Sequence, residues 1–354
     1  MNNRIKIGIT HGDINSISYE IILKALSDSR LAELCTIIIY GSPKALAFYK
    51  KQLDMNKINI PTIRSVEDAK LEKSYILNCC AEDVNVEMGK QTLEAGSIAL
   101  EALEMATQDL KEGKIDALVT APINKNTIQS DKFQFSGHTE YFENRTDGKS
   151  IMMLISDNVR VALATNHTPV KQISESLSKQ LIVDKLMMLN QSLKKDFTVT
   201  CPRIAVLGLN PHSSDNGLLG NEENDIITPA IEEATSKGVM CFGPLSADGF
   251  WGSGAFAKYD AILAMYHDQG LTPFKTLFQE TGVNFTAGLN IVRTSPAHGT
   301  AYDLVGKNEA NCQSLLNAIY MAIDIVRARK MHNEINANPL KVESYHRPKH
   351  YISE

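Results

Sequence analysis

The chain has 354 residues, of which 43% are hydrophobic and 22% are charged. These proportions are ordinary for a globular protein, and this length allows one large domain or two of ordinary size. The net charge of -5 argues against a nucleic-acid-binding protein, because such proteins usually carry a basic patch or stripe. No apolar run approaches the roughly 20 residues that a membrane-spanning helix needs, and the N-terminal sequence MNNRIKIGIT lacks the long apolar region of a signal peptide. We therefore expect a cytoplasmic protein that binds neither membranes nor nucleic acids.

The six cysteines are scattered along the chain and include no C-x-x-C pair, so neither a zinc ribbon nor a thioredoxin-type motif is indicated. Cys79 and Cys80 are adjacent and lie in an apolar run, YILNCC, that is typical of a buried strand. We expect reduced thiols in the core of a cytosolic protein.

Short apolar runs alternate with amphipathic stretches along the chain. The last three of these runs each end in a polar cluster. The runs cover 4–10, 35–41, 115–122, 159–167, 203–210 and 259–267. Strands that alternate with helices predict an α/β fold with a mostly parallel sheet, in which ligands gather beyond the carboxyl ends of the strands.

The clearest helix is predicted over 92–113, and Gly113 supplies its end. Its apolar face consists of four leucines, Leu93, Leu100, Leu103 and Leu110. An earlier helix is predicted to begin with Ser42 as its N-cap and Pro43 at its first position. The polar stretch 336–354 contains two prolines and is predicted to be a peripheral tail.

Three histidines, His167, His212 and His267, each fall at or just past the end of a predicted strand. Imidazole is the commonest ligand for borderline divalent metals, and three imidazoles leave an open position for a substrate. Their long spacing forms no local motif, and a lone histidine after a strand is more often a hydrogen-bonded loop residue. The residues by themselves leave both interpretations open.

Several polar residues suit an anion. Thr139, in SGHTE, is predicted near the N-terminus of a helix, where anions are favoured, although an N-cap fits equally well. Lys275, Asn284 and Arg293 suit a phosphate together with a carboxylate, because arginine binds either group in bidentate fashion. Lys275 also fits a solvated surface charge, whereas Arg293 follows the apolar run LNIV.

The segment SPAHGTAYDLVGK covers 295–307. Gly299 would let the backbone approach a ligand closely and Thr300 offers a hydroxyl, although an ordinary turn before a helix fits as well. No G-x-G-x-x-G motif follows a strand, so a Rossmann dinucleotide site is not indicated.

Short motifs that extend from residue 8 to residue 306 resemble those of one known family. The motifs are GITHGD (8–13), VTAPINK (119–125), GHTE (137–140), LNPH (209–212) followed by G-x-E-E (220–223), AMYHDQG (264–270), GVN (282–284) and RTSPAHGTAYDLVG (293–306). AMYHDQG and GHTE are quite specific. On these motifs the chain resembles the 4-hydroxythreonine-4-phosphate dehydrogenases of vitamin B6 synthesis, the PdxA-like family.

The resemblance implies a two-domain α/β fold like that of isopropylmalate dehydrogenase, with mostly parallel sheets and a cleft between the domains. We expect the first domain to comprise 1–130 plus 300–354. The second, 131–299, would contribute the metal site and the dimer interface. This fold binds NAD without a Rossmann fingerprint, which agrees with the missing motif.

The resemblance also implies residue roles. The family's divalent-metal ligands correspond to His167 and His212 from one subunit and His267 from its partner. The resemblance therefore implies that the site requires a homodimer. Asp248, in SADGF, matches an acidic residue near the metal. Substrate-binding positions are matched by His138, Thr139, Lys275, Asn284 and Arg293. The cofactor-binding loop is matched by His298, Gly299, Thr300 and Ala301.

The implied substrate is 4-phosphooxy-L-threonine, a small phosphorylated hydroxy amino acid. NAD or NADP would oxidise its C3 alcohol with help from a divalent ion, zinc, cobalt or magnesium. The 3-oxo amino acid would then lose CO2 to give 3-amino-2-oxopropyl phosphate. Lys275, or a water held near Asp248, is the candidate proton acceptor.

Three alternatives remain open. A sister dehydrogenase would oxidise 4-phospho-D-threonate or 4-phospho-D-erythronate at the same kind of site. A zinc hydrolase would use the three histidines to activate water and would need no nicotinamide. A non-catalytic ligand-binding module would show no turnover.

Two segments depart from the usual family pattern. The family usually reads G-D-P-A-G-I-G-P-E where this chain has GDINSISYE, so Ser16 and Ser18 replace glycines. His11, just before this segment, stands where proline is usual. The loop 248–260 also differs and contains the only tryptophan, Trp251.

Overall fold

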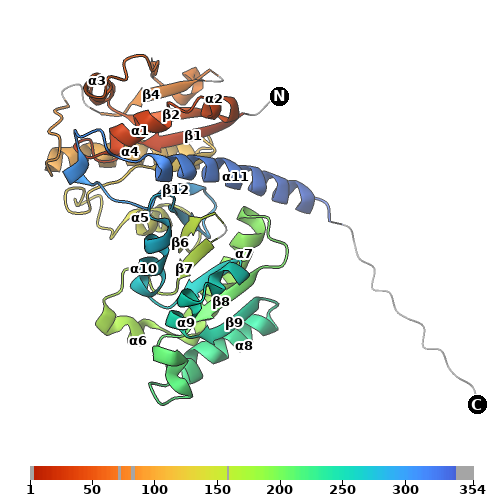
Figure 1. Ribbon diagram of the computed structural model, residues 1–354. Helices are drawn as coiled ribbons and strands as arrows, with labels where there is room; N and C mark the ends of the chain where they lie inside the picture. The colour runs from red at the N-terminus through yellow and green to blue at the C-terminus, as the bar shows by residue number, and fades with distance from the viewer. Residues whose placement is uncertain (1–3, 71–72, 81–83, 158, 340–354) are drawn as a thin grey trace, which may run out of the picture.

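The computed structural model describes residues 4–70, 73–80, 84–157 and 159–339 (Figure 1). The strands of the described residues form one sheet in the order β3-β4-β2-β1-β5-β12-β11-β6-β7-β10-β8-β9. The strands are β1 Ile5–Thr10, β2 Cys35–Gly41, β3 Thr62–Ile63, β4 Ser74–Asn78, β5 Ala117–Thr120, β6 Ile151–Ser156, β7 Val159–Leu163, β8 Arg203–Leu207, β9 Met240–Leu245, β10 Ala261–Ala264, β11 Val283–Ala287 and β12 Arg293–Pro296. All six predicted strands are therefore present.

Helices connect most of the strands. They are α1 Ser18–Ala25, α2 Arg30–Leu34, α3 Pro43–Gln52, α4 Leu93–Lys111, α5 His138–Arg145, α6 Ile173–Ser176, α7 Lys179–Asp196, α8 Thr228–Ser236, α9 Ala247–Gly252, α10 His267–Phe278 and α11 Gln313–Asn336. None of the described helices is long and apolar enough to cross a membrane.

Most neighbouring strands are parallel, which confirms the predicted α/β class, but the middle of the sheet is antiparallel. β11 runs antiparallel to both β12 and β6, and β6 runs antiparallel to β7. Antiparallel neighbours need only a short connection, and residues 288–292 suffice between β11 and β12. The parallel strands on the two sides of this region consequently run in opposite directions. The division into 1–130 with 300–354 and 131–299 stays a prediction.

Helices cover both faces of the sheet, so its central strands are buried on both sides. Within β2, Ile39 packs in one apolar cluster with Ile319 of α11, whereas the next residue, Tyr40, packs in a second cluster with Leu103 of α4. In Figure 1, α11 crosses between the part of the fold with β1, β2 and β4 and the part with β6 to β9. This long helix contacts β1, β5, β11 and β12 of the sheet, and it also contacts α1 and α7.

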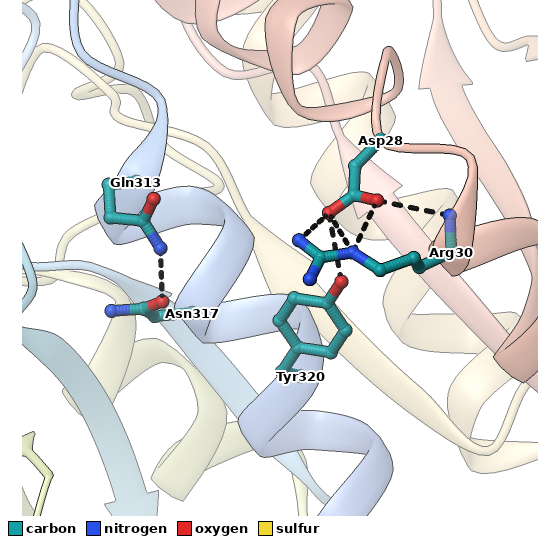
Figure 2. A network of polar contacts seen from close by, with 5 residues as sticks. All are labelled: Asp28, Arg30, Gln313, Asn317 and Tyr320. Carbon is teal, nitrogen blue, oxygen red and sulfur yellow. Dashed lines mark hydrogen bonds and ion pairs between the residues drawn. The ribbon is translucent and has the colours of Figure 1, made fainter.

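A polar network joins α11 to the connection between α1 and α2 (Figure 2). Tyr320 donates a hydrogen bond to Asp28 at 3.0 Å, and Arg30 pairs with the same carboxylate at 2.6 Å. One turn earlier on α11, Gln313 donates to Asn317 at 2.7 Å. The hydrogen bonds from Arg30 hold the pKa of Asp28 well below its usual range.

The helix predicted over 92–113 is α4, capped by the Thr92 hydroxyl, which accepts a hydrogen bond from the amide of Ala95. Leu100, Leu103 and Leu110 are buried as predicted, but the prediction for Leu93 is wrong because that side chain is 74% exposed. The first turn of α4 instead approaches the 124–128 segment through Gly96.

The thiols also differ in detail from the prediction. β4 ends at Asn78, so Cys79 and Cys80 follow the strand rather than lie within it. All six cysteines are free of disulfides, and Cys79 is buried as expected, whereas Cys80 is only half-buried. The predicted peripheral tail falls mostly on 340–354, outside the described residues.

We expect Gly96→Ala to lower the free energy of unfolding. A Cβ at this position would lie 2.0 Å from the backbone oxygen of Thr127. Overpacking typically costs about 1–3 kcal/mol, and a rigid backbone neighbour puts this site at the upper end, beyond the ~1 kcal/mol that alanine gains in helix propensity. Gly249→Ala in α9 is the matched control, because its Cβ would meet nothing within 4 Å. Chemical denaturation of both variants tests this, and equal midpoints would contradict it.

Candidate functional site

Arg293 is a fully buried arginine at the start of β12, with 2% of its surface exposed. Its Nε and Nη2 atoms donate to the Thr120 hydroxyl at 3.1 and 2.6 Å, and Nη1 donates to the Thr286 hydroxyl at 3.2 Å. Burial lowers the pKa of Arg293 to about 9, so the group remains charged at neutral pH. No ion pair to this guanidinium forms among the described residues. Because an unpaired buried charge is unfavourable, the arrangement points to an anionic ligand.

The N-terminal end of α5 lies beside this guanidinium. Arg293 is 5.7 Å from the centre of the Phe142 ring. The residue before the helix is Gly137, and Thr139 is the second helical residue, buried and capping nothing. The N-cap interpretation of Thr139 is therefore wrong. The free backbone N–H groups of a first turn favour a bound anion, which agrees with the charge of Arg293.

His138 lies in the same region as a neutral imidazole. Burial is the largest cause that lowers its pKa, and the positive charges of Arg293 and Lys125 lower it further. Its Nε2 atom is buried and has no hydrogen-bond partner among the described residues. Buried polar atoms are almost always paired, so this nitrogen is available to a ligand.

Asn284 on β11 presents a second unpaired atom. Its Oδ1 is buried without a partner in the described part of the chain. Alternate residues of a strand share a face, so Asn284 points to the same side of the sheet as Thr286, which contacts Arg293. Arg293, His138, Thr139 and Asn284 are thus the predicted substrate residues that the structure associates with one region.

Glu140, also on α5, links this region to a predicted metal ligand. Its Oε1 lies 3.3 Å from Nδ1 of His167. Burial by itself would raise the pKa of Glu140, but the hydrogen bond with His167 contributes to a net lowering, so the carboxylate stays ionised. The charge of Glu140 also interacts with that of Arg293. Sequence reasoning gave Glu140 no role, although the GHTE motif contains it.

Lys125 and Thr120 were missed in the same way. Both belong to the VTAPINK motif, and no role was assigned to either. The Lys125 amino group would lie 3.9 Å from a Cβ added at Gly137, and its charge acts on His138. By contrast, Lys275 is exposed on α10, and no contact joins it to Arg293 or His138 within the described residues.

His167 and His267 lie together in one chain, with ring centres 5.7 Å apart. Nδ1 of His267 is 2.6 Å from a carboxylate oxygen of Asp268, as Nδ1 of His167 is close to Glu140. A carboxylate at Nδ1 orients the ring and leaves Nε2 for a metal, which is the usual arrangement around zinc-bound imidazole. These two residues therefore fit a divalent ion.

The buried Gln269 explains how His267 is positioned at the start of α10. Its side chain accepts from the Met265 amide at 2.7 Å and donates to the Gly208 carbonyl at 2.6 Å. Gly270 follows, where a Cβ would lie 2.8 Å from Val161. The DQG part of the AMYHDQG motif thus joins the ends of β10 and β8 and lets α10 pack closely on β7.

His212 lies in a strained loop. Residues 212–216 all have positive φ, between 47° and 66°. Glu223 accepts a hydrogen bond from the Asn210 amide at 2.7 Å, and Ser213 donates to the Pro244 carbonyl at 3.1 Å. Such strain persists only where neighbouring contacts impose it, and it is concentrated at functional sites.

Asp248 on α9 lies near this loop. The Ser246 hydroxyl, which donates to Asp248 at 2.6 Å, is the largest cause that lowers the pKa of Asp248, and the charge of His212 contributes as well. Among the described residues of a single chain, the side chain of His212 does not lie close enough to those of His167 and His267 for the three to bind one metal ion. Asp248 and His212 are both exposed.

The predicted cofactor loop packs against the segment that follows β1. The Ile17 amide donates to the Thr300 carbonyl at 3.3 Å, and the Tyr302 hydroxyl donates to Asp13 at 2.6 Å. Nε2 of His298 is buried without a partner among the described residues, and burial lowers the pKa of His298. A Cβ at Gly299 would meet nothing within 4 Å. This loop therefore has one unpaired polar atom and open space beside its glycine, which fits a cofactor.

Comparison with known proteins assigns the family. Residues 33–322 match the family described as pyridoxal phosphate biosynthetic protein PdxA. A 4-hydroxythreonine-4-phosphate dehydrogenase of Bacteroides thetaiotaomicron is 52% identical over 97% of this chain and 94% of its own length. A putative D-threonate 4-phosphate dehydrogenase of Oceanobacillus iheyensis is 35% identical over 92% of this chain and 99% of its own.

Comparison with solved structures indicates the same family as these relatives. The crystal structure of 4-hydroxythreonine-4-phosphate dehydrogenase from Klebsiella pneumoniae matches with a TM-score of 0.77 and 31% identity over 92% of this chain and 99% of that one. A terephthalate 1,2-cis-dihydrodioldehydrogenase from Burkholderia xenovorans LB400, at 22% identity and a TM-score of 0.60 over 91% of this chain and 98% of that one, shares the fold. The fold, the matched residues and these relatives together show that the chain belongs to the PdxA family.

Proposed function

We propose that this protein is a 4-hydroxythreonine-4-phosphate dehydrogenase. It oxidises the C3 alcohol of 4-phosphooxy-L-threonine with NAD or NADP, and the product loses CO2 to give 3-amino-2-oxopropyl phosphate for pyridoxal 5'-phosphate synthesis. The observation that carries the proposal is the buried Arg293, which forms no ion pair among the described residues and whose charge acts on His138, the first residue of α5. The relative from Bacteroides thetaiotaomicron supports the specific substrate.

Arg293 binds an anionic group of the substrate, phosphate or carboxylate. Thr120 and Thr286 hold the guanidinium in place, so little side-chain entropy is lost on binding. His138 is neutral and offers a hydrogen bond rather than a second full charge. Thr139 and Asn284 complete the contacts that fix C3 of the substrate in position.

His167, His212 and His267 hold the divalent ion, zinc, cobalt or magnesium. Glu140 and Asp268 orient two of these rings through Nδ1. An ion held by these histidines would supply electrostatic stabilisation of the deprotonated C3 alcohol, and a nicotinamide cofactor would supply the hydride acceptor. The segment His298–Ala301 holds that cofactor, and the unpaired Nε2 of His298 supports this role.

The proton acceptor is Lys275 or a water held near Asp248. Asp248 is ionised because Ser246 donates a hydrogen bond to it. Both side chains are exposed in the single chain. A homodimer that divides the metal ligands between its subunits is therefore part of the proposal, because the second subunit would enclose this side of the site.

The second candidate is a sister activity, oxidation of 4-phospho-D-threonate or 4-phospho-D-erythronate. The relative from Oceanobacillus iheyensis favours it, and both kinds of substrate share the phosphate and the C3 alcohol. The higher identity of the relative from Bacteroides thetaiotaomicron favours 4-phosphooxy-L-threonine.

We expect turnover to require both nicotinamide and a divalent ion. The absorbance of reduced nicotinamide should rise with 4-phosphooxy-L-threonine, disappear on chelation and return with zinc, cobalt or magnesium. His267→Ala should behave like the chelated enzyme, because two imidazoles bind a divalent ion more weakly than three. Turnover without nicotinamide would indicate a hydrolase and reject the dehydrogenase. A signal only with the threonate or erythronate phosphates would establish the sister activity.

Replacement of Arg293 should separate binding from stability. Arg293→Met should lower kcat/KM by roughly 10- to 100-fold, because a lost charge-assisted hydrogen bond is worth about 1.5–3 kcal/mol. The free energy of unfolding of Arg293→Met should equal or exceed that of the wild type, because the variant removes a buried charge that has no ion pair among the described residues.

Arg329→Met is the matched control, because Arg329 is also buried but pairs with Asp196 at 2.7 Å. It should destabilise the fold by about 3–5 kcal/mol, since the carboxylate of Asp196 is left unpaired. Kinetics and chemical denaturation measure both effects. Wild-type kinetics of Arg293→Met would refute its role in binding the anion.

Subunit mixing tests the shared site. His212→Ala and His267→Ala should each be inactive, and a re-associated mixture should recover activity if these ligands come from different subunits. No recovery in proven heterodimers would mean that each chain builds its own site. A mixture of His167→Ala and His267→Ala then identifies the subunit of origin, because it recovers only if these two histidines act from different chains.

A further inference from the structure

A second group of metal-binding side chains lies at the carboxyl ends of β1 and β4, the strands on either side of β2. His11 follows β1 and Cys79 and Cys80 follow β4. The His11 amide donates to the Tyr40 carbonyl at 3.0 Å, and the Cys79 amide donates to the Gly41 carbonyl at 3.3 Å. The end of β2 thus fixes the backbone of both segments.

Gly41 leaves the space in which these side chains meet. A Cβ there would lie 3.0 Å from Cβ and Cγ of His11 and 2.7 Å from the Tyr19 hydroxyl. His11 is fully buried, Cys79 is 9% exposed, and Cys80 is half-buried. The group is therefore enclosed on the side of His11 and open on the side of Cys80.

The distances suit a metal ion. One ligand atom from each of His11, Cys79 and Cys80 lies within 4.8 Å of the others. The two sulfur atoms are 3.8 Å apart. Two sulfurs that each lie about 2.3 Å from a tetrahedral zinc ion are separated by about 3.8 Å, whereas a disulfide needs about 2.05 Å.

The imidazole of His11 presents a free nitrogen. Nε2 lies 3.4 Å from the Ile98 carbonyl oxygen, which accepts if that nitrogen carries the proton. Nδ1 then has a lone pair, and it has no hydrogen-bond partner among the described residues. A backbone carbonyl on one ring nitrogen and a metal on the other is the usual outer-shell arrangement of metal-bound histidine.

We propose that His11, Cys79 and Cys80 form a binding site for one thiophilic metal ion, with zinc as the ion to test. Two thiolates and one imidazole supply three ligands, and the open side next to Cys80 admits water as the fourth. Thiolate ligands select zinc or copper(I) over magnesium or calcium. This site is separate from the three-histidine site of the proposed dehydrogenase, which has no sulfur ligand.

The position of this site couples it to the predicted cofactor loop. His11 is two residues from Asp13, which accepts the hydrogen bond from Tyr302. The same segment continues to Ile17, whose amide donates to Thr300. An ion bound by His11 fixes the start of this segment, so we expect zinc to raise the thermal unfolding temperature of the full chain.

Cobalt(II) titration of the reduced, chelator-treated full chain tests the proposal. Cobalt bound by thiolate absorbs in the near ultraviolet, and cobalt bound only by imidazole does not. Wild type and His267→Ala should show this absorption, and Cys79→Ser/Cys80→Ser should lose it. Cys201→Ser, which removes an exposed thiol elsewhere, is the matched control and should keep it. Zinc content should fall by one ion per chain in the double variant and should stay at the wild-type value in Cys201→Ser.

Single variants keep the test valid if the double variant does not fold. Cys80→Ser changes one half-buried sulfur and should weaken the absorption, and His11→Asn should do the same with both thiols present. Circular dichroism establishes that each variant is folded. Absence of the absorption in wild type with free thiols, or its persistence in the double variant, would overturn the proposal. Neither result bears on nicotinamide reduction, so failure of the dehydrogenase proposal remains a separate outcome.

Discussion

The burial of a guanidinium without a carboxylate partner is the constraint on which the rest of the candidate site depends. Among the described residues, the guanidinium of Arg293 donates its hydrogen bonds to the hydroxyls of Thr120 and Thr286. Arg329, a buried arginine in the same fold, has full partners. It pairs with Asp196 and donates to the carbonyls of residues 289, 290 and 291. A buried charge without an ion pair among the described residues is unfavourable, and in the proposed function the anionic group of the substrate offsets that cost.

The negative charge of Glu140 connects this guanidinium to the histidines. Its carboxylate contacts His167 and interacts with Arg293, so one acidic side chain adjoins both the anion region and the proposed metal region. The short helix α5 carries Glu140, His138 and Thr139 in its first turn. Any displacement of α5 would therefore change substrate contacts and the orientation of His167 together.

Local patterns in the sequence predicted those residues whose position follows directly from the strand in which they lie or which they follow. The strand-end histidines and the buried Arg293 are of this kind, and the apolar runs predicted the six strands themselves. The roles of Lys125, Glu140 and Thr120 depend on how α5 packs against β5 and β12, which no local period encodes. The same limit explains Leu93, which periodicity assigned to the core although Gly96 makes the contact there. The antiparallel centre of the sheet also depends on long-range pairing.

The departures from the usual family sequence lie in two places: the segment 12–20 packs against the predicted cofactor loop, and the loop 248–260 contains Asp248, whose charge interacts with that of His212. Ser16 and Ser18 are fully buried, and their hydroxyls are satisfied by each other and by the carbonyls of Asp13 and Pro122. The serines thus rebuild with side-chain hydrogen bonds a turn for which the family usually has glycine. This turn touches Thr300 through Ile17, whereas the hydrogen bonds of Arg293 are made to Thr120 and Thr286, outside this turn. Under the proposed function, the serine replacements therefore bear on the segment that packs against His298–Ala301 rather than on the contacts of Arg293.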